Sequence, residues 1–198
     1  HGETGTGKSA LARALHDVSK RRDGPFIPFH CGAVPESLIE SELVGHVKGA
    51  FTGADYDHEG VFVHADGGTL FLDEVADMSP DLQKNLLRVI EDGKVRALGA
   101  KTPLQVDVRI LSSTSRDLER MVLEGGFRRD LYFRLKAIVL EVPPLRDRRE
   151  DVLPLARHFL EMHAILERKP VPHLERLASL KLLRYRWPGN VREIENEM

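Results

Sequence analysis

The feature that most constrains this chain is a glycine-rich loop that ends in a lysine and a serine. The loop reads Gly2-Glu3-Thr4-Gly5-Thr6-Gly7-Lys8-Ser9 and fits the pattern G-x-x-x-x-G-K-[ST]. In this pattern backbone N–H groups cradle phosphates at a helix N-terminus, the lysine reaches the β- and γ-phosphates, and the hydroxyl binds Mg²⁺. The alternative is an ordinary glycine-rich turn. Helical spacing follows at once, however, in Leu11, Ala12, Leu15 and Val18.

A second feature is an acidic pair at the end of an apolar segment. Residues 68–72 predict a buried strand, which runs directly into Asp73 and Glu74. Ligands of α/β sheets bind at the carboxyl ends of the strands. We therefore expect Asp73 to bind Mg²⁺ and Glu74 to polarise or deprotonate an attacking water. Such a pair seen alone is more often a solvated loop, and the phosphate loop favours the catalytic interpretation.

The rest of the chain alternates strands with helices and then becomes all-helical. Further strands are predicted at 25–30, from Val106 toward Ser115, and at 137–142; helices are predicted after Lys8 and at 35–44, 80–92, 117–124 and 127–135. Pro143-Pro144 marks a boundary, and beyond it only helical patterns occur. This order predicts an α/β ATPase core with a parallel sheet flanked by helices at 1–144, and a small helical lid at 145–198. A strand normally precedes such a loop, so we expect the first strand to be missing and the lid to be truncated.

Between these motifs lies the hexapeptide Gly49-Ala50-Phe51-Thr52-Gly53-Ala54, which ATP chemistry does not require. Its glycines permit positive φ and indicate a mobile loop that presents Phe51 to a partner. The alternative is a tight turn that tucks Phe51 into the core.

Arginines suited to stabilising a phosphoryl-transfer transition state occur at Arg128, Arg129, Arg134 and Arg192. The first three could equally form a solvated basic helix face paired with Asp130. Arg192 follows Trp187-Pro188-Gly189-Asn190, a segment that breaks the chain and caps a new helix, so it could reach the nucleotide from the lid.

Bulk properties exclude several classes of function. The net charge of −2 argues against a free-standing nucleic-acid binder, so DNA contact would need a domain absent from this chain. A single cysteine excludes internal disulfides and fits a reducing cytoplasm. Neither a membrane-length apolar run nor a secretory signal is found, and we expect no membrane association.

Together these residues resemble the central AAA+ domain of bacterial enhancer-binding proteins, the activators of sigma-54 RNA polymerase. The resemblance covers nearly the whole chain and includes the hexapeptide, residues 67–74, 127–135 and 187–193. It implies a cytoplasmic Mg²⁺-ATP hydrolase that forms a hexameric or heptameric ring. Residues 49–54 would contact the sigma factor and remodel the closed promoter complex. Arg128 and Arg134 would act on a neighbour's nucleotide, and Arg192 would be the lid's sensor.

Four positions depart from the family pattern. Ser9 stands where Glu is common, although it restores the general phosphate-loop residue. His30 takes the place of a switch Asn that couples the acidic glutamate to nucleotide state, and could still hydrogen-bond Glu74. Ser115 replaces the Asn that follows Thr114 in the first sensor, and Val47 replaces a common Glu. Two alternatives therefore stay open: a nucleotide-binding assembly module with weak hydrolysis, and another AAA+ remodeller or a kinase.

Overall fold

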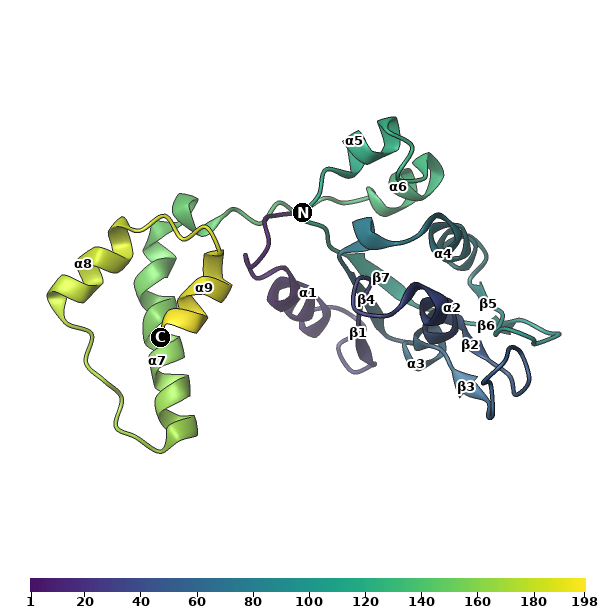
Figure 1. The fold of residues 1–198 in the computed structure, drawn as a ribbon, viewed down its shortest axis with the longest axis horizontal. Helices are drawn as coiled ribbons and strands as arrows, with labels where there is room; N and C mark the ends of the chain where they lie inside the picture. The colour runs from purple at the N-terminus through teal and green to yellow at the C-terminus, as the bar shows by residue number, and fades with distance from the viewer. The chain divides into compact units, whose positions relative to one another are not determined.

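The computed structural model describes residues 1–198 apart from the side chains of Glu36 and Ser37, and it divides into two compact units (Figure 1). The sheet unit consists of residues 9–139, and the helical unit consists of residues 1–8 with residues 140–198. Among the described helices, none combines the length and the apolar character that a membrane span requires.

The centre of the sheet unit is a three-stranded parallel sheet in the order β1-β4-β7. Its strands are β1 (Phe26–His30), β4 (Thr69–Asp73) and β7 (Arg109–Ser112). The middle strand β4 is apolar and buried, as a parallel strand covered on both faces must be. His30 is in register with Asp73, and Leu72 with Ser112, so the carboxyl ends of all three strands lie at one edge.

Helices lie around this sheet (Figure 1). They are α1 (Lys8–Asp17), α2 (Glu36–Val44), α3 (Val61–His64), the 3₁₀ turn η1 (Val75–Asp77), α4 (Pro80–Asp92), α5 (Leu118–Leu123) and α6 (Arg129–Leu135). Helix α4 begins at a proline and ends at Gly93, whose φ of 62° suits a glycine C-cap. The core joins α2, α3, α4 and α6 to β4 through Leu43, Phe62, Leu72, Leu86 and Leu131.

Two short antiparallel hairpins extend the sheet unit. One pairs β2 (Gly45–His46) with β3 (His58–Glu59) and carries the predicted hexapeptide loop. The other pairs β5 (Lys94–Val95) with β6 (Leu104–Gln105). The strand predicted from Val106 begins only at Arg109, because the N–H of Val106 continues the second hairpin by donating to the Gly93 carbonyl at 2.8 Å.

The helical unit contains η2 (Leu145–Asp147), η3 (Arg149–Asp151), α7 (Val152–Glu167), α8 (Arg176–Arg184) and α9 (Asn190–Glu197). Its own small core contains Leu145, Val152, Phe159, Trp187 and Ile194. The strand predicted at 137–142 is not formed. Leu140 and Val142 bond the backbone of the single residue His1, which is too little pairing for a ladder. A parallel sheet flanked by helices, with a helical C-terminal part, nevertheless matches the predicted fold class.

Candidate active site

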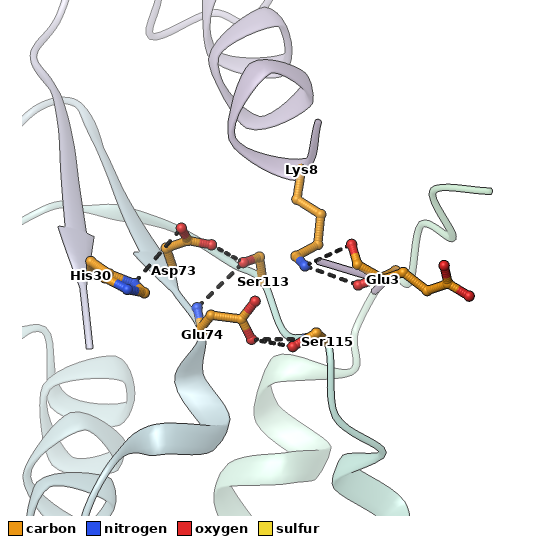
Figure 2. A network of polar contacts seen from close by, with 8 residues as sticks. Glu3, Lys8, His30, Asp73, Glu74, Ser113 and Ser115 are labelled. Atoms are coloured by element: carbon orange, nitrogen blue, oxygen red, sulfur yellow. Dashed lines mark hydrogen bonds and ion pairs between the residues drawn. The ribbon is translucent and has the colours of Figure 1, made fainter. Parts of the chain in front are cut away.

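Glu74 stands where the chain leaves β4, and its backbone turns sharply there. It is in the left-handed region, with φ 55° and ψ 56°, a conformation that costs a residue with a side chain about 1–2 kcal/mol. Ser115 donates two hydrogen bonds to the Glu74 carboxylate oxygen Oε2, from its backbone N–H at 2.8 Å and from its hydroxyl at 2.9 Å (Figure 2). The segment after β7 therefore fixes one oxygen of the predicted general base.

Asp73, the last residue of β4, is held in a similar way by Ser113. The Ser113 hydroxyl donates to Oδ1 of Asp73, and the N–H of Glu74 points to the same hydroxyl at 3.4 Å (Figure 2). Ser113 was not singled out from the sequence. The signal was present, because a polar residue directly after a parallel strand lies at the ligand-binding edge.

His30 and Thr114 lie at the same edge. The Nδ1 atom of His30 is 3.8 Å from Oδ2 of Asp73, so this side chain lies against the predicted metal ligand, the residue that directly precedes Glu74. Thr114 is buried, and its hydroxyl accepts from the N–H of Arg116 at 3.0 Å. A tight local turn thus fixes the Thr114 hydroxyl.

The oxygen donors in the sheet unit suit Mg²⁺. Asp73 supplies a half-buried carboxylate, and Ser9, in the first turn of α1, supplies an exposed hydroxyl. Groups of three or more His, Cys, Asp and Glu able to hold a metal are absent from the described residues. A carboxylate and a hydroxyl are oxygen ligands of the kind that Mg²⁺ accepts, since it usually takes one or two protein ligands and completes its shell with water and phosphate oxygens.

The phosphate loop belongs to the helical unit, where its glycines adopt the backbone that the motif needs. Gly5 and Gly7 have φ of 78° and 98°, and a Cβ on Gly5 would lie 2.4 Å from the Gly189 carbonyl oxygen. The Lys8 ammonium donates to the carbonyls of Gly2 at 2.9 Å and Glu3 at 3.3 Å (Figure 2). The lysine head is therefore held along the loop.

Glu3 connects this loop to the helices of the same unit. Arg146 grips its carboxylate with two hydrogen bonds of 2.7 and 2.8 Å, and Asn190 adds a third at 3.2 Å. The Arg146 hydrogen bonds, followed by that of Asn190, lower the pKa of Glu3 to about 2. Asn190 is fully buried and also donates to the Thr4 carbonyl at 3.1 Å.

The first residues of helix α9, which carries Arg192, are hydrogen-bonded to the phosphate loop. The N–H of Val191 donates to the Gly5 carbonyl at 2.8 Å, and the N–H of Arg192 lies 3.4 Å from the same oxygen. The Arg192 side chain is exposed. In addition, Arg148 donates to the Thr6 carbonyl at 2.6 Å. Arg146 and Arg148 follow the Pro143-Pro144 break, and no motif or spacing in the sequence links them to the loop.

The predicted arginines of the sheet unit lie on or beside α6. Arg128 precedes the helix and forms a two-bond ion pair with Asp130, at 3.0 and 2.6 Å, which raises the pKa of the Arg128 guanidinium. Arg134 lies in the last turn and is exposed. The guanidinium of Arg129 lies over the Phe133 ring at 5.7 Å. All three side chains are therefore at the surface of the unit.

The hexapeptide forms a closed loop at the end of the β2–β3 hairpin. Gly49 and Gly53 have φ of 81° and 100°, and the Gly49 N–H donates to the Ala54 carbonyl at 2.8 Å. Phe51 is 38% exposed, and its ring meets the buried His46 ring edge-on at 5.0 Å. The loop presents Phe51 at the surface, supported from one side.

Comparison with known families assigns both parts of the chain. A family model described as the sigma-54 interaction domain matches residues 1–141, and one described as the AAA+ ATPase lid domain matches residues 146–198.

Curated relatives are bacterial transcription regulators. The chain is 54% identical to the transcriptional regulatory protein ZraR of Klebsiella oxytoca, over 99% of this chain and 44% of that protein. It is 52% identical to the DNA-binding transcriptional regulator NtrC of Azospirillum brasilense, over 98% of this chain and 40% of that protein. The chain thus spans less than half the length of these relatives.

Solved structures give the same fold. NtrX from Brucella abortus in complex with ADP aligns with a TM-score of 0.90 at 37% identity, covering 98% of this chain and 42% of that one. Its ATP complex aligns with a TM-score of 0.89. Hsp104 from S. cerevisiae, at 19% identity and a TM-score of 0.71 over 98% of this chain and 38% of that one, shares the fold alone.

Proposed function

The chain belongs to the sigma-54 interaction domain family, and we propose on that premise that it hydrolyses Mg²⁺-ATP to drive a sigma-54-dependent transcription activator. The observation that carries the proposal is the pair of hydrogen bonds from Ser115 to Glu74 at the carboxyl edge of the sheet. They support the proposal because they orient one carboxylate oxygen at the edge of the sheet where ligands of α/β sheets bind, and an attacking water needs a base of this kind.

The proposed chemistry divides among a few side chains. Lys8 and the N–H groups of residues 2–9 would bind the phosphates, and Arg192 would contact the nucleotide from α9. Asp73 and Ser9 would hold Mg²⁺, which supplies positive charge to the phosphate oxygens when bound. Glu74 would orient the attacking water and accept its proton.

Charge on the transition state would be stabilised from a neighbouring copy. Arg128 and Arg134 are proposed to act in trans within a ring of six or seven subunits, because both lie at the surface of the sheet unit. Thr114 and Ser115 would sense the γ-phosphate, and His30, beside Asp73, would link the metal ligand to nucleotide state. The exposed ion pair of Arg128 with Asp130 would have to open for Arg128 to reach that phosphate.

The loop of residues 49–54 is the part proposed to contact the partner protein. Phe51 and Thr52 are both exposed, and Phe51 offers an aromatic anchor of the kind that dominates protein interfaces. The partner would be the sigma-54 RNA polymerase holoenzyme in the bacterial cytoplasm, with DNA bound by a domain outside this chain.

One observation favours a second candidate, a nucleotide-binding module with weak hydrolysis. Both hydrogen-bond donors of Ser115, its backbone N–H and its hydroxyl, are bonded to Glu74 and would have to be released to contact a γ-phosphate. A phosphate-release assay that compares the parent with Glu74→Gln separates the two. A large loss in the variant supports the hydrolase, and equal rates support the weak module.

A further inference from the structure

Helix α4 carries a buried glutamine, Gln83, that has no role in the chemistry proposed above. Gln83 is 1% exposed and lies on the same face as Leu86 and Leu87, so it is a polar side chain on an apolar stripe. Burying an amide is unfavourable by about 1–3 kcal/mol unless its hydrogen bonds are made inside the protein. Its partners therefore indicate what it does.

All of the hydrogen-bond partners of Gln83 are backbone groups. Its Nε2 atom donates to the carbonyls of Met78 at 2.9 Å and Gly126 at 3.2 Å. Its Oε1 atom accepts from the N–H of Arg128 at 2.7 Å. Two donors and one acceptor are used at once, and an amide is the side chain that offers both.

These three partners belong to two segments with proposed chemical roles. Met78 ends the short turn that starts at Glu74, where the N–H of Asp77 bonds the Glu74 carbonyl and that of Met78 bonds the Val75 carbonyl. Gly126 and Arg128 lead into α6, and Arg128 is its N-cap. One buried amide thus ties the exit of β4 to the entry of the arginine helix.

The N–H of Arg128 also needs such a partner. At the start of a helix the first N–H groups have no acceptor within the helix. Gln83 accepts this one, and the carbonyl of Arg128 then begins the helix by accepting from the N–H of Tyr132 at 3.0 Å. This hydrogen bond therefore holds the backbone at the start of α6, the helix that carries Arg134.

We infer that Gln83 is a positioning residue that holds the arginine-bearing helix α6 in register with the segment after Glu74. The inference rests on the proposed function, in which Arg128 and Arg134 complete a neighbour's site. Gln83 would contact neither nucleotide nor water, and would act through the backbone of Arg128.

The test is Gln83→Met in the full chain. Methionine has nearly the same length and helix propensity as glutamine, so α4 keeps its packing while all three hydrogen bonds are lost. Because displacement of a catalytic group by about 1 Å can cost roughly 100-fold, we expect kcat for ATP to fall about 10- to 100-fold. ATP affinity should stay within about twofold, since the loss concerns only the transition state.

A mixing experiment distinguishes positioning of the arginines from damage to the variant's own site. Glu74→Gln subunits have intact arginines, so adding them should restore turnover at Gln83→Met sites. Arg134→Ala subunits mixed in the same way are the reference. If that reference recovers and Gln83→Met does not, the Gln83 inference is wrong and the proposed function stands. If neither recovers, the shared site and the inference both fail.

Two further variants keep the result interpretable. Asn85→Leu on the same helix removes a 2.6 Å hydrogen bond to Glu40, on the side of α2, and should keep turnover near that of the parent. An equal loss in Asn85→Leu would mean that any damage to α4 has this effect, and would overturn the inference. Should Gln83→Met not fold, Gln83→Asn keeps the amide one methylene shorter, and the same recovery on mixing is expected.

Discussion

Ser115 donates two hydrogen bonds to Oε2 of Glu74, from its backbone N–H at 2.8 Å and from its hydroxyl at 2.9 Å. The two residues follow different strands, β4 and β7, that are neighbours in the parallel sheet. Their contact joins the proposed base to the proposed sensor of the γ-phosphate. A movement of Ser115 would therefore shift the Glu74 carboxylate directly.

Ser115→Ala removes one of these two hydrogen bonds and leaves the backbone one. A hydrogen bond to a charged group contributes about 1.5–3 kcal/mol, so we expect kcat for ATP to fall about 10- to 100-fold with little change in ATP affinity. Steady-state phosphate release and nucleotide titration measure the two quantities. Ser112→Ala, at an exposed serine that ends β7, is the control and should behave as the parent. A fully active Ser115→Ala protein would show that the hydroxyl does not orient the base.

Glu3→Gln tests the grip of Arg146 on the phosphate loop. The pKa of Glu3 is lowered from 4.5 to about 2, so its charged form stabilises the fold above pH 4.5, and this contribution is lost as pH falls toward 2. The variant should therefore unfold at a lower temperature than the parent at neutral pH. This gap in unfolding temperature should narrow below about pH 4.5 and with added salt. Thermal unfolding followed by circular dichroism measures it, with the exposed Glu150→Gln as control. A gap that is independent of pH would contradict the ion pair.

Arg134→Ala should abolish turnover while ATP still binds, because the exposed Arg134 side chain is assigned to a neighbour's phosphate. Mixing this variant with Glu74→Gln subunits should recover part of the activity, since each supplies what the other lacks. Arg129→Ala, on the same helix and without an assigned role, is the matched control. Phosphate release that stays at background across all mixing ratios would argue against a site shared between subunits.

Phe51→Leu should separate ATP hydrolysis from binding to sigma-54. Gly49 and Ala54 close the loop through their backbones, so the loop should survive loss of the aromatic ring. We expect near-parental phosphate release but a fall of about tenfold or more in binding to sigma-54 when a transition-state analogue is bound. Tyr56→Leu, another exposed aromatic beside His46, is the control and should bind as the parent. Equal binding by Phe51→Leu and the parent would refute the loop's role.

Much of the fold could be predicted from local patterns. Helix α4 is bounded by Pro80 and Gly93, and β4 by its switch from apolar residues to Asp73, because proline, glycine and burial act within a few residues. The segment at 137–142 has the composition of a strand, yet strands also need partners, and pairing is not a local property. The late start of β7 has the same cause, since Val106 bonds Gly93.

The candidate site was predictable in its charged residues and not in the polar groups that hold them. Asp73 and Glu74 stand out at a strand end, whereas Ser113 and Gln83 carry only weak signals in the sequence. Their roles arise from hydrogen bonds across 40 and 45 positions of the chain. Gln83 did leave one signal, a polar residue four positions before Leu87 on the apolar stripe of α4.

The most direct test of the central claim is the rate of phosphate release by the full chain and by its Glu74→Gln variant, at saturating ATP and Mg²⁺. The variant keeps the shape of the side chain and removes its ability to accept a proton. Loss of a general base predicts a fall in kcat of about 100-fold or more, with ATP still bound. Equal rates in parent and variant would contradict the assignment of Glu74 as the base of an ATP hydrolase.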